Sequence, residues 1–178
     1  MFIARLITGI RKLKYLYKTL TTTIMKLIES YTLNQEEKMA VFELWNQEYP
    51  KNLGYTKINE FDDYLNKLEE KHHVLVKDEN DQVVGWYSNF IRDNEIWFAM
   101  ILDTSIQGKG IGTKLLNMAK KRNHILNGWV IDHKLNIKAN GSIYRSPLEF
   151  YMKNEFQLFP EVRLELPLIS AVKISWSK

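Results

Sequence analysis

A glycine-rich turn between a strand-like run and a helix-like segment constrains the fold of this chain most. The apolar run 95–103, EIWFAMILD, is typical of a β-strand. The segment from Gly110 to about Lys121 predicts a helix with Ile111, Leu115, Leu116 and Ala119 on its buried face. Gly108, Gly110 and Gly112 lie at alternate positions in the turn, in a chain with only 8 glycines. They let the backbone take positive φ and approach a ligand closely. Because the first amides of a helix have no partner within it, the turn predicts a phosphate or pyrophosphate site.

The spacing of these glycines differs from two common phosphate motifs. A P-loop requires Gly-x-x-x-x-Gly-Lys-Ser/Thr, which this turn lacks. A dinucleotide fingerprint requires a third glycine where Thr113 stands. A tight packing turn without a ligand remains the alternative interpretation.

The pattern from Met25 onward predicts one domain of the α/β (α+β) class. Strands are predicted at 26–33, 73–77, 83–91, 95–103, 128–132, 156–166 and 170–176. Helices are predicted from Asn34 to about Tyr49, at about 59–71, at 110–121 and at 146–154, with Asn34 and Ser146 as caps. A polar loop occupies 134–146. The order is strand, two helices, three strands, helix, strand, helix, two strands, and it predicts a mixed sheet in which 95–103 and 128–132 are parallel.

Composition excludes several kinds of chemistry. The chain has no cysteine, so it forms no disulfide, no zinc–thiolate site and no cysteine nucleophile. Its 4 histidines form no His-x-x-x-His pair, and we expect no metal. No run reaches the 18 apolar residues of a membrane span, and we expect a cytoplasmic protein.

The basic charge is concentrated in residues 1–24. This extension has five Lys or Arg residues and no acid, so the net charge of +4 for the chain leaves −1 for residues 25–178. We therefore expect no nucleic-acid partner for the body of the protein. The extension is amphipathic at close to helical period. A helix packed on the body, a helix on a membrane surface and an extension without a role in the main activity all remain open.

Two motifs resemble the GNAT N-acetyltransferase superfamily. The sequence QGKGIG, residues 107–112, resembles the Gln/Arg-x-x-Gly-x-Gly/Ala signature that follows the fourth strand in that family. About 40 residues later, FYMKNEF resembles the family pattern Tyr-x-Lys-x-Gly-Phe. The order of predicted elements is also similar, and the resemblance covers residues 25–178. It implies a sheet of about seven strands with a splayed parallel pair, flanked by about four helices.

The resemblance implies acetyl-CoA as co-substrate. The pyrophosphate would lie on backbone amides of the turn, and the pantetheine arm would pair with the strand before it, between the two splayed strands. The implied cofactor-binding residues are Met100, Ile101, Leu102, Gln107, Gly108, Lys109, Gly110, Ile111, Gly112 and Thr113.

The implied reaction is transfer of the acetyl group to a primary amine by direct attack in a ternary complex. The resemblance gives Tyr151 the role of general acid for the departing thiolate, although a core tyrosine beside Phe150 is the alternative. The backbone amide of Leu102 or a neighbour is the implied oxyanion donor. Glu95 is the candidate base, or else an exposed residue at a strand end, and Asp132 and His133 are further candidates.

The acceptor is expected between the first two helices and the centre of the sheet. Trp45, Glu48 and Tyr49, followed by Tyr55, offer aromatic rings and a carboxylate for a cationic amine, although core packing explains Trp45 equally well. Two departures from the family pattern lie on this side, because Glu155 replaces a usual glycine and Tyr144 replaces a frequent asparagine. Expected partners are a small-molecule or peptide amine and, in a homodimer, a second copy of the chain. The alternative function is a non-catalytic module that binds or senses CoA.

Overall fold

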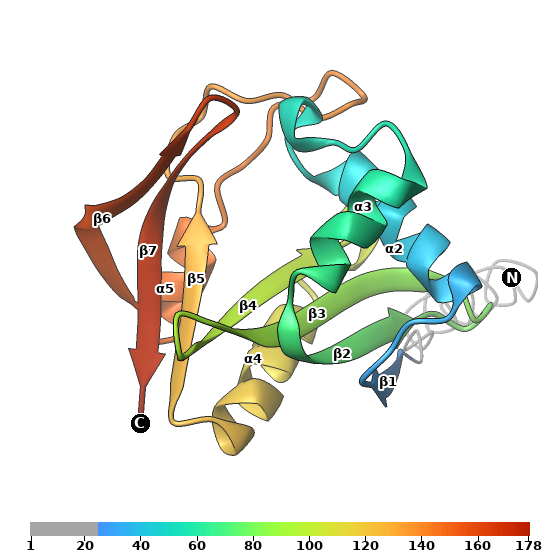
Figure 1. Cartoon of the computed structure of the whole chain (residues 1–178), viewed down its shortest axis with the longest axis horizontal. Coiled ribbons are helices and arrows are strands. Elements are labelled where there is room, and N and C mark those ends of the chain that lie inside the picture. The colour runs from blue at the N-terminus through green and yellow to red at the C-terminus, as the bar shows by residue number, and fades with distance from the viewer. Residues whose placement is uncertain (1–24) are drawn as a thin grey trace, which may run out of the picture.

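The computed structural model describes residues 25–178, which form a mixed sheet with helices on both faces (Figure 1). The predicted order of elements is confirmed. In chain order they are β1 Lys26–Ser30, α2 Gln35–Glu48, α3 Ile58–Asn66, β2 Glu69–Lys77, β3 Val83–Arg92, β4 Glu95–Leu102, α4 Ile111–Arg122, β5 Ile125–Val130, α5 Leu148–Lys153, β6 Gln157–Leu166 and β7 Ile169–Ser177. Short 3-10 turns occupy Lys51–Leu53 and Thr104–Ile106.

The seven strands lie in the order β1-β2-β3-β4-β5-β7-β6. Neighbouring strands are antiparallel except β4 and β5, which are parallel as predicted. The predicted fold class is therefore confirmed, and β4 lies in the middle of the sheet. The interpretations of residues 1–24 concern a segment outside the described residues. In the described part of the chain, no helix is both long enough and apolar enough to cross a membrane.

Local sequence signals fix the start of α2. The Asn34 side chain accepts a hydrogen bond from the Glu37 amide, and the Glu37 carboxylate accepts one from the Asn34 amide, which together form a capping box. The predicted end of the next helix was wrong, because α3 ends at Asn66 rather than Lys71. Leu68 continues the apolar spacing but lies beyond the helix, where Glu70 takes a φ of 44° that no right-handed helix allows. Apolar spacing alone did not reveal this end.

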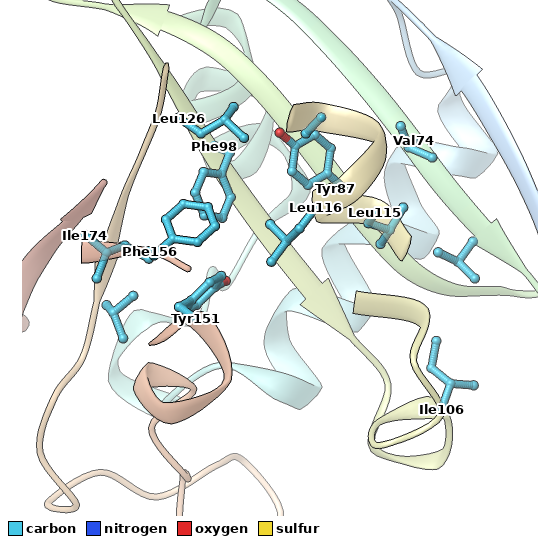
Figure 2. Close-up of a cluster of buried hydrophobic side chains, with 13 residues drawn as sticks. Val74, Tyr87, Phe98, Ile106, Leu115, Leu116, Leu126, Tyr151, Phe156 and Ile174 are labelled. Carbon is cyan, nitrogen blue, oxygen red and sulfur yellow. The ribbon is translucent and has the colours of Figure 1, made fainter. Parts of the chain in front are cut away.

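Alternate residues of the strands divide between two hydrophobic cores. On one face α4 and α5 cover Tyr87, Phe98 and Leu126, and Figure 2 shows these side chains with Leu116, Tyr151 and Phe156. On the other face α2 and α3 cover Leu75, Trp86 and Ile101 with Val41, Trp45 and Phe61. The central strands β3 and β4 are therefore covered on both faces. This arrangement leaves the edge of β4 that faces β5 as the accessible backbone at the centre of the sheet.

Candidate active site

The parallel strands β4 and β5 pair at a single position, Trp97 with Asn127. Both residues lie near the start of their strands, and the two strands separate toward their carboxyl ends (Figure 1). The backbone groups of β4 beyond Trp97 that face β5 therefore have no strand partner. The predicted splayed pair is present.

Hydrogen-bond alternation assigns which groups of β4 face this opening. The Asp103 amide donates to the Val84 carbonyl at 2.9 Å, and Leu102 lies opposite Gly85. In an antiparallel pair, hydrogen-bonded positions alternate, so Ile101 bonds to β3 whereas Met100 and Leu102 point their backbone groups toward β5. The Leu102 carbonyl already accepts the Gln107 side-chain amide at 2.8 Å. Of the three predicted strand residues, Met100 and Leu102 face the opening, and Ile101 contributes its side chain to the core.

The glycine turn leads from the end of β4 into the start of α4. Gly108 and Gly110 have φ values of 71° and 80°, and a Cβ at either position would meet no protein atom within 4 Å. Gly110 is the N-cap of α4, and no side chain caps the helix. The amides of Ile111, Gly112 and Thr113 are therefore left without a partner in the helix. Glycine is needed at Gly108 and Gly110 for conformation, and their lack of side chains keeps the helix end open.

At the third position of the turn, Gly112, glycine is required for a different reason. A Cβ on Gly112 would lie 2.8 Å from Cζ of Phe150, so this glycine lets α5 pack closely against α4. Gln107 connects the turn to the rest of the site, since its side chain reaches the Leu102 carbonyl and, at 3.4 Å, the Glu48 carboxylate. Lys109 is exposed. The predicted cofactor residues thus lie together at one end of the opening.

Tyr151 lies on α5 and packs against Phe98 and Phe156, with ring centroids 5.6 Å from each (Figure 2). Only 6% of its surface is exposed. Burial, with smaller contributions from Tyr49, Tyr144 and Tyr87, raises the pKa of Tyr151 well above its usual value, so its hydroxyl stays protonated at neutral pH. A protonated hydroxyl is the form that a proton donor requires.

Two further tyrosines accompany Tyr151. Tyr49 follows α2 and Tyr144 lies in the long loop 134–146, and their rings stack at 6.5 Å with an interplanar angle of 12°. Burial raises the pKa of Tyr49 to about 12 and also raises the pKa of Tyr144. Sequence reasoning identified Tyr144 as a departure from the family pattern but not as a neighbour of Tyr49. A stacked pair across about 95 positions of sequence leaves no local signal in the chain.

The Glu48 carboxylate joins three segments. It accepts hydrogen bonds from the Thr104 amide and hydroxyl, both at 2.9 Å, and it forms an ion pair with Lys138. Its side chain is 10% exposed and that of Lys138 is 14% exposed. Glu48 therefore ties the end of α2 to the turn after β4 and to the loop 134–146.

Trp45 lies deeper, where its indole N–H donates to the Leu53 carbonyl at 2.9 Å. Its ring contacts those of Tyr49, Tyr55, Phe61, Tyr64 and Trp86. These contacts give Trp45 a packing role in the core between α2, α3 and the sheet.

The candidate bases differ in how they are held. Glu95 accepts hydrogen bonds from Asn127 at 3.0 Å and from Lys173 at 3.2 Å, and its side chain is 41% exposed. Asp132 makes a two-point ion pair with Arg163 at 3.0 and 3.1 Å, and this hydrogen bonding holds the pKa of Asp132 below its usual value. The His133 ring accepts from the Leu135 amide. Among residues 25–178, no group of three acidic or histidine side chains converges to hold a metal.

Comparison with known proteins identifies the family of this chain and the class of its fold. The family described as the acetyltransferase (GNAT) domain matches residues 70–158, which is half of the chain. The chain therefore belongs to the GNAT acetyltransferase family. A search of curated proteins gave no match to this chain.

Solved structures show the same fold at low sequence identity. A protein from Acinetobacter baylyi ADP1, assigned as an acetyltransferase, has a TM-score of 0.64 at 14% identity, covering 89% of this chain and 95% of its own. An acyl-CoA N-acyltransferase from Pseudomonas aeruginosa has a TM-score of 0.61 at 12% identity, covering 85% and 99%. A phosphinothricin acetyltransferase from Sinorhizobium meliloti, solved with acetyl-CoA, has a TM-score of 0.58 at 13% identity, covering 86% and 88%.

Proposed function

We propose that this protein transfers the acetyl group of acetyl-CoA to a primary amine of a small-molecule or peptide acceptor. The observation that carries the proposal is the splayed pair β4 and β5, which opens beside a glycine turn with uncapped helix amides. An extended pantetheine arm fits the unpaired backbone groups of Met100 and Leu102, and a pyrophosphate fits the amides of Ile111, Gly112 and Thr113. Membership of the GNAT family supports this assignment.

The chain supplies groups for each part of the transfer. A backbone amide of β4 that faces the opening, from Met100 or Leu102, donates a hydrogen bond to the carbonyl oxygen as negative charge develops on it. As the acceptor nitrogen forms its bond to the acetyl carbon, the carbon–sulfur bond breaks, and the Tyr151 hydroxyl gives its proton to the sulfur. The proton lost by the nitrogen passes to a base. The proton balance is then restored through solvent.

Glu95 is the base that we propose, acting directly or through a water molecule. Its carboxylate is oriented by Asn127 and Lys173 and remains open to solvent. Asp132 is a weaker candidate because the hydrogen bonds from Arg163 hold the pKa of its carboxyl low, which reduces its affinity for a proton.

We propose that the acceptor approaches from the face of the sheet that carries α2 and α3. Tyr49, paired with Tyr144, would form part of the acceptor site. Trp45 and Glu48 would shape that site from behind, because their polar atoms are bonded to Leu53, Thr104 and Lys138. We propose a cytoplasmic location, where acetyl-CoA is available to such an enzyme.

The test measures cofactor binding and turnover separately. Calorimetric titration with acetyl-CoA and with CoA tests the cofactor site, and release of free CoA thiol with a panel of amines tests catalysis. We expect Tyr151→Phe to lower kcat by roughly 100- to 10,000-fold while CoA affinity is retained. Tight CoA binding without turnover of any amine would favour a non-catalytic sensing module. A folded protein that binds neither acetyl-CoA nor CoA would overturn the proposal.

A further inference from the structure

Arg92 is a half-buried cation near the amino end of β4, where β4 and β5 meet. It lies at the end of β3, and its guanidinium carbon is 5.3 Å from the ring centre of Phe90 and 5.6 Å from that of Trp97. Trp97 is the residue at which β4 meets β5. The guanidinium is thus held on aromatic surfaces at the closed end of the opening.

Strand register places the neighbours of Arg92 on one face of the sheet. Glu95 lies directly opposite Arg92, and Trp129, Lys173 and Phe159 lie opposite one another across β5, β7 and β6. The rings of Trp97 and Trp129 stack at 5.1 Å, and the Lys173 ammonium lies 5.2 Å from the Trp97 ring. This face therefore presents stacked indoles flanked by two cations, Arg92 and Lys173.

Three carboxylates of the candidate site already have cationic partners. Glu95 pairs with Lys173, Asp132 pairs with Arg163, and Glu48 pairs with Lys138. Arg92 forms no ion pair with any carboxylate in the described part of the chain, and residues 1–24 contain no acid. The surplus charge on this face is therefore positive, and it resides on a guanidinium.

A guanidinium that is partly withdrawn from water is costly unless an anion accepts its hydrogen bonds. Its planar set of donors matches a carboxylate or a phosphate, which it binds at two points. We propose that Arg92 binds an anionic group of the acceptor, so that the acceptor is an amine that also carries a carboxylate or phosphate. This inference rests on the proposed acetyl transfer, whose acceptor class it specifies.

The position of Arg92 limits the size of the acceptor. The first unpaired backbone groups of β4 follow Trp97 within three residues, and a strand rises about 3.3 Å per residue. Arg92 lies opposite Glu95, and its guanidinium reaches the Trp97 ring, so an anionic group held there is on the order of 10 Å from the point of transfer. The half-buried indole of Trp129, stacked on the buried Trp97, offers an apolar surface between them. A polyamine, which is cationic, meets like charge here, because Glu95 is paired with Lys173 and the Arg92 guanidinium repels it.

The experiment compares amines that differ by the anionic group alone. The pairs are 4-(aminomethyl)benzoate with 4-methylbenzylamine, 5-aminopentanoate with pentylamine, and O-phosphoethanolamine with ethanolamine. For the wild type we expect kcat/KM to be at least about 10-fold higher for the anionic member of a pair. We expect Arg92→Gln to remove most of this ratio and Arg92→Lys to retain part of it. Lys121→Gln, an exposed cation on α4, controls for the change in net charge and leaves the ratio unaltered.

If none of these amines is turned over, a binding measurement tests whether Arg92 binds an anionic group. In protein saturated with CoA, benzoate and O-phosphoethanolamine should raise the melting temperature of the wild type more than that of Arg92→Gln, and their neutral counterparts should not. Comparison of benzoate with O-phosphoethanolamine shows whether the site prefers a carboxylate or a phosphate. The inference is overturned if the wild type shows no preference for the anionic compound over its neutral counterpart, or if Arg92→Gln shows the same preference. Because CoA binding is measured on the same samples, loss of the cofactor site is recognised separately.

Discussion

Replacement of Gly110 tests the pyrophosphate site most directly, and the structure provides a matched control. Gly110 and Gly141 both have φ of 80°, and a Cβ at either position meets no protein atom within 4 Å. Alanine at either position therefore brings the cost of the left-handed conformation without a clash. That cost is about 1 kcal/mol. For a chain of this length it lowers the melting temperature by about 2–4 °C.

The two variants differ in what the added Cβ obstructs. Gly110 is the N-cap directly before the Ile111, Gly112 and Thr113 amides, where the pyrophosphate is proposed to bind, whereas Gly141 lies in the loop 134–146. Loss of two hydrogen bonds to a charged phosphate costs about 3 kcal/mol or more, which weakens CoA binding by roughly 100-fold. Gly110→Glu adds a negative charge beside the pyrophosphate and should abolish measurable binding.

Calorimetric titration with CoA and a thermal melt of each variant measure both effects. We expect Gly110→Ala and Gly141→Ala to melt within a few degrees of each other and to differ by about two orders of magnitude in Kd. Equal CoA affinity in folded samples of the two variants would refute the assignment of this turn to the pyrophosphate. A clearly larger loss of stability in Gly110→Ala than in Gly141→Ala would show that the glycine turn also contributes packing contacts to the stability of the fold.

Three further predictions concern residues that the fold holds in unusual environments. Glu155 has φ of 65° at the end of α5, which glycine adopts without strain. Glu155→Gly should therefore raise the free energy of unfolding by about 0.5–1 kcal/mol in urea denaturation, even though it removes the ion pair with Lys120. An unchanged or lower free energy of unfolding would contradict this prediction. Glu48→Ala leaves the Lys138 ammonium without its carboxylate partner and should lower the free energy of unfolding by about 3 kcal/mol. The double variant Glu48→Ala, Lys138→Met should recover part of this loss. A loss under about 0.5 kcal/mol in the single variant would exclude a structural role for the pair. Burial, followed by the charges of Lys71 and His72, lowers the pKa of His73 to about 4, so the unfolded chain binds a proton that the native state does not between pH 6.5 and 4. Stability should therefore fall by about 2.5 kcal/mol between pH 7 and pH 4.5, and His73→Gln, which can still accept from the Trp86 indole, should reduce that fall when urea denaturation is compared at the two pH values.

The geometry of the proposed cofactor half of the site was predictable because it is encoded locally. The strand, turn and helix from Glu95 to Arg122 are consecutive, and positive φ, an uncapped helix start and an unpaired strand edge all leave signals in adjacent residues. The end of α5 shows the limit of such signals. Glu155 departs from the glycine of the family pattern, yet it adopts the conformation usual for glycine. The Phe156 amide donates to the Tyr151 carbonyl, and the Glu155 amide donates to the Met152 carbonyl. Those two bonds define the turn whatever residue occupies it.

The acceptor half was less predictable because its charges are paired across long stretches of chain. Glu48 meets Lys138 over 90 positions, and Glu95 meets Lys173 over 78. The sequence alone suggests that Glu48 is a free carboxylate for a cationic amine, whereas the structure gives it four internal donors. A carboxylate that is already neutralised attracts a further cation weakly, and the same pairing leaves Arg92 in excess. The sign of charge that the proposed acceptor site would favour therefore depends on which ion pairs the fold completes, and structures that share the fold at 12–15% identity carry little information about it.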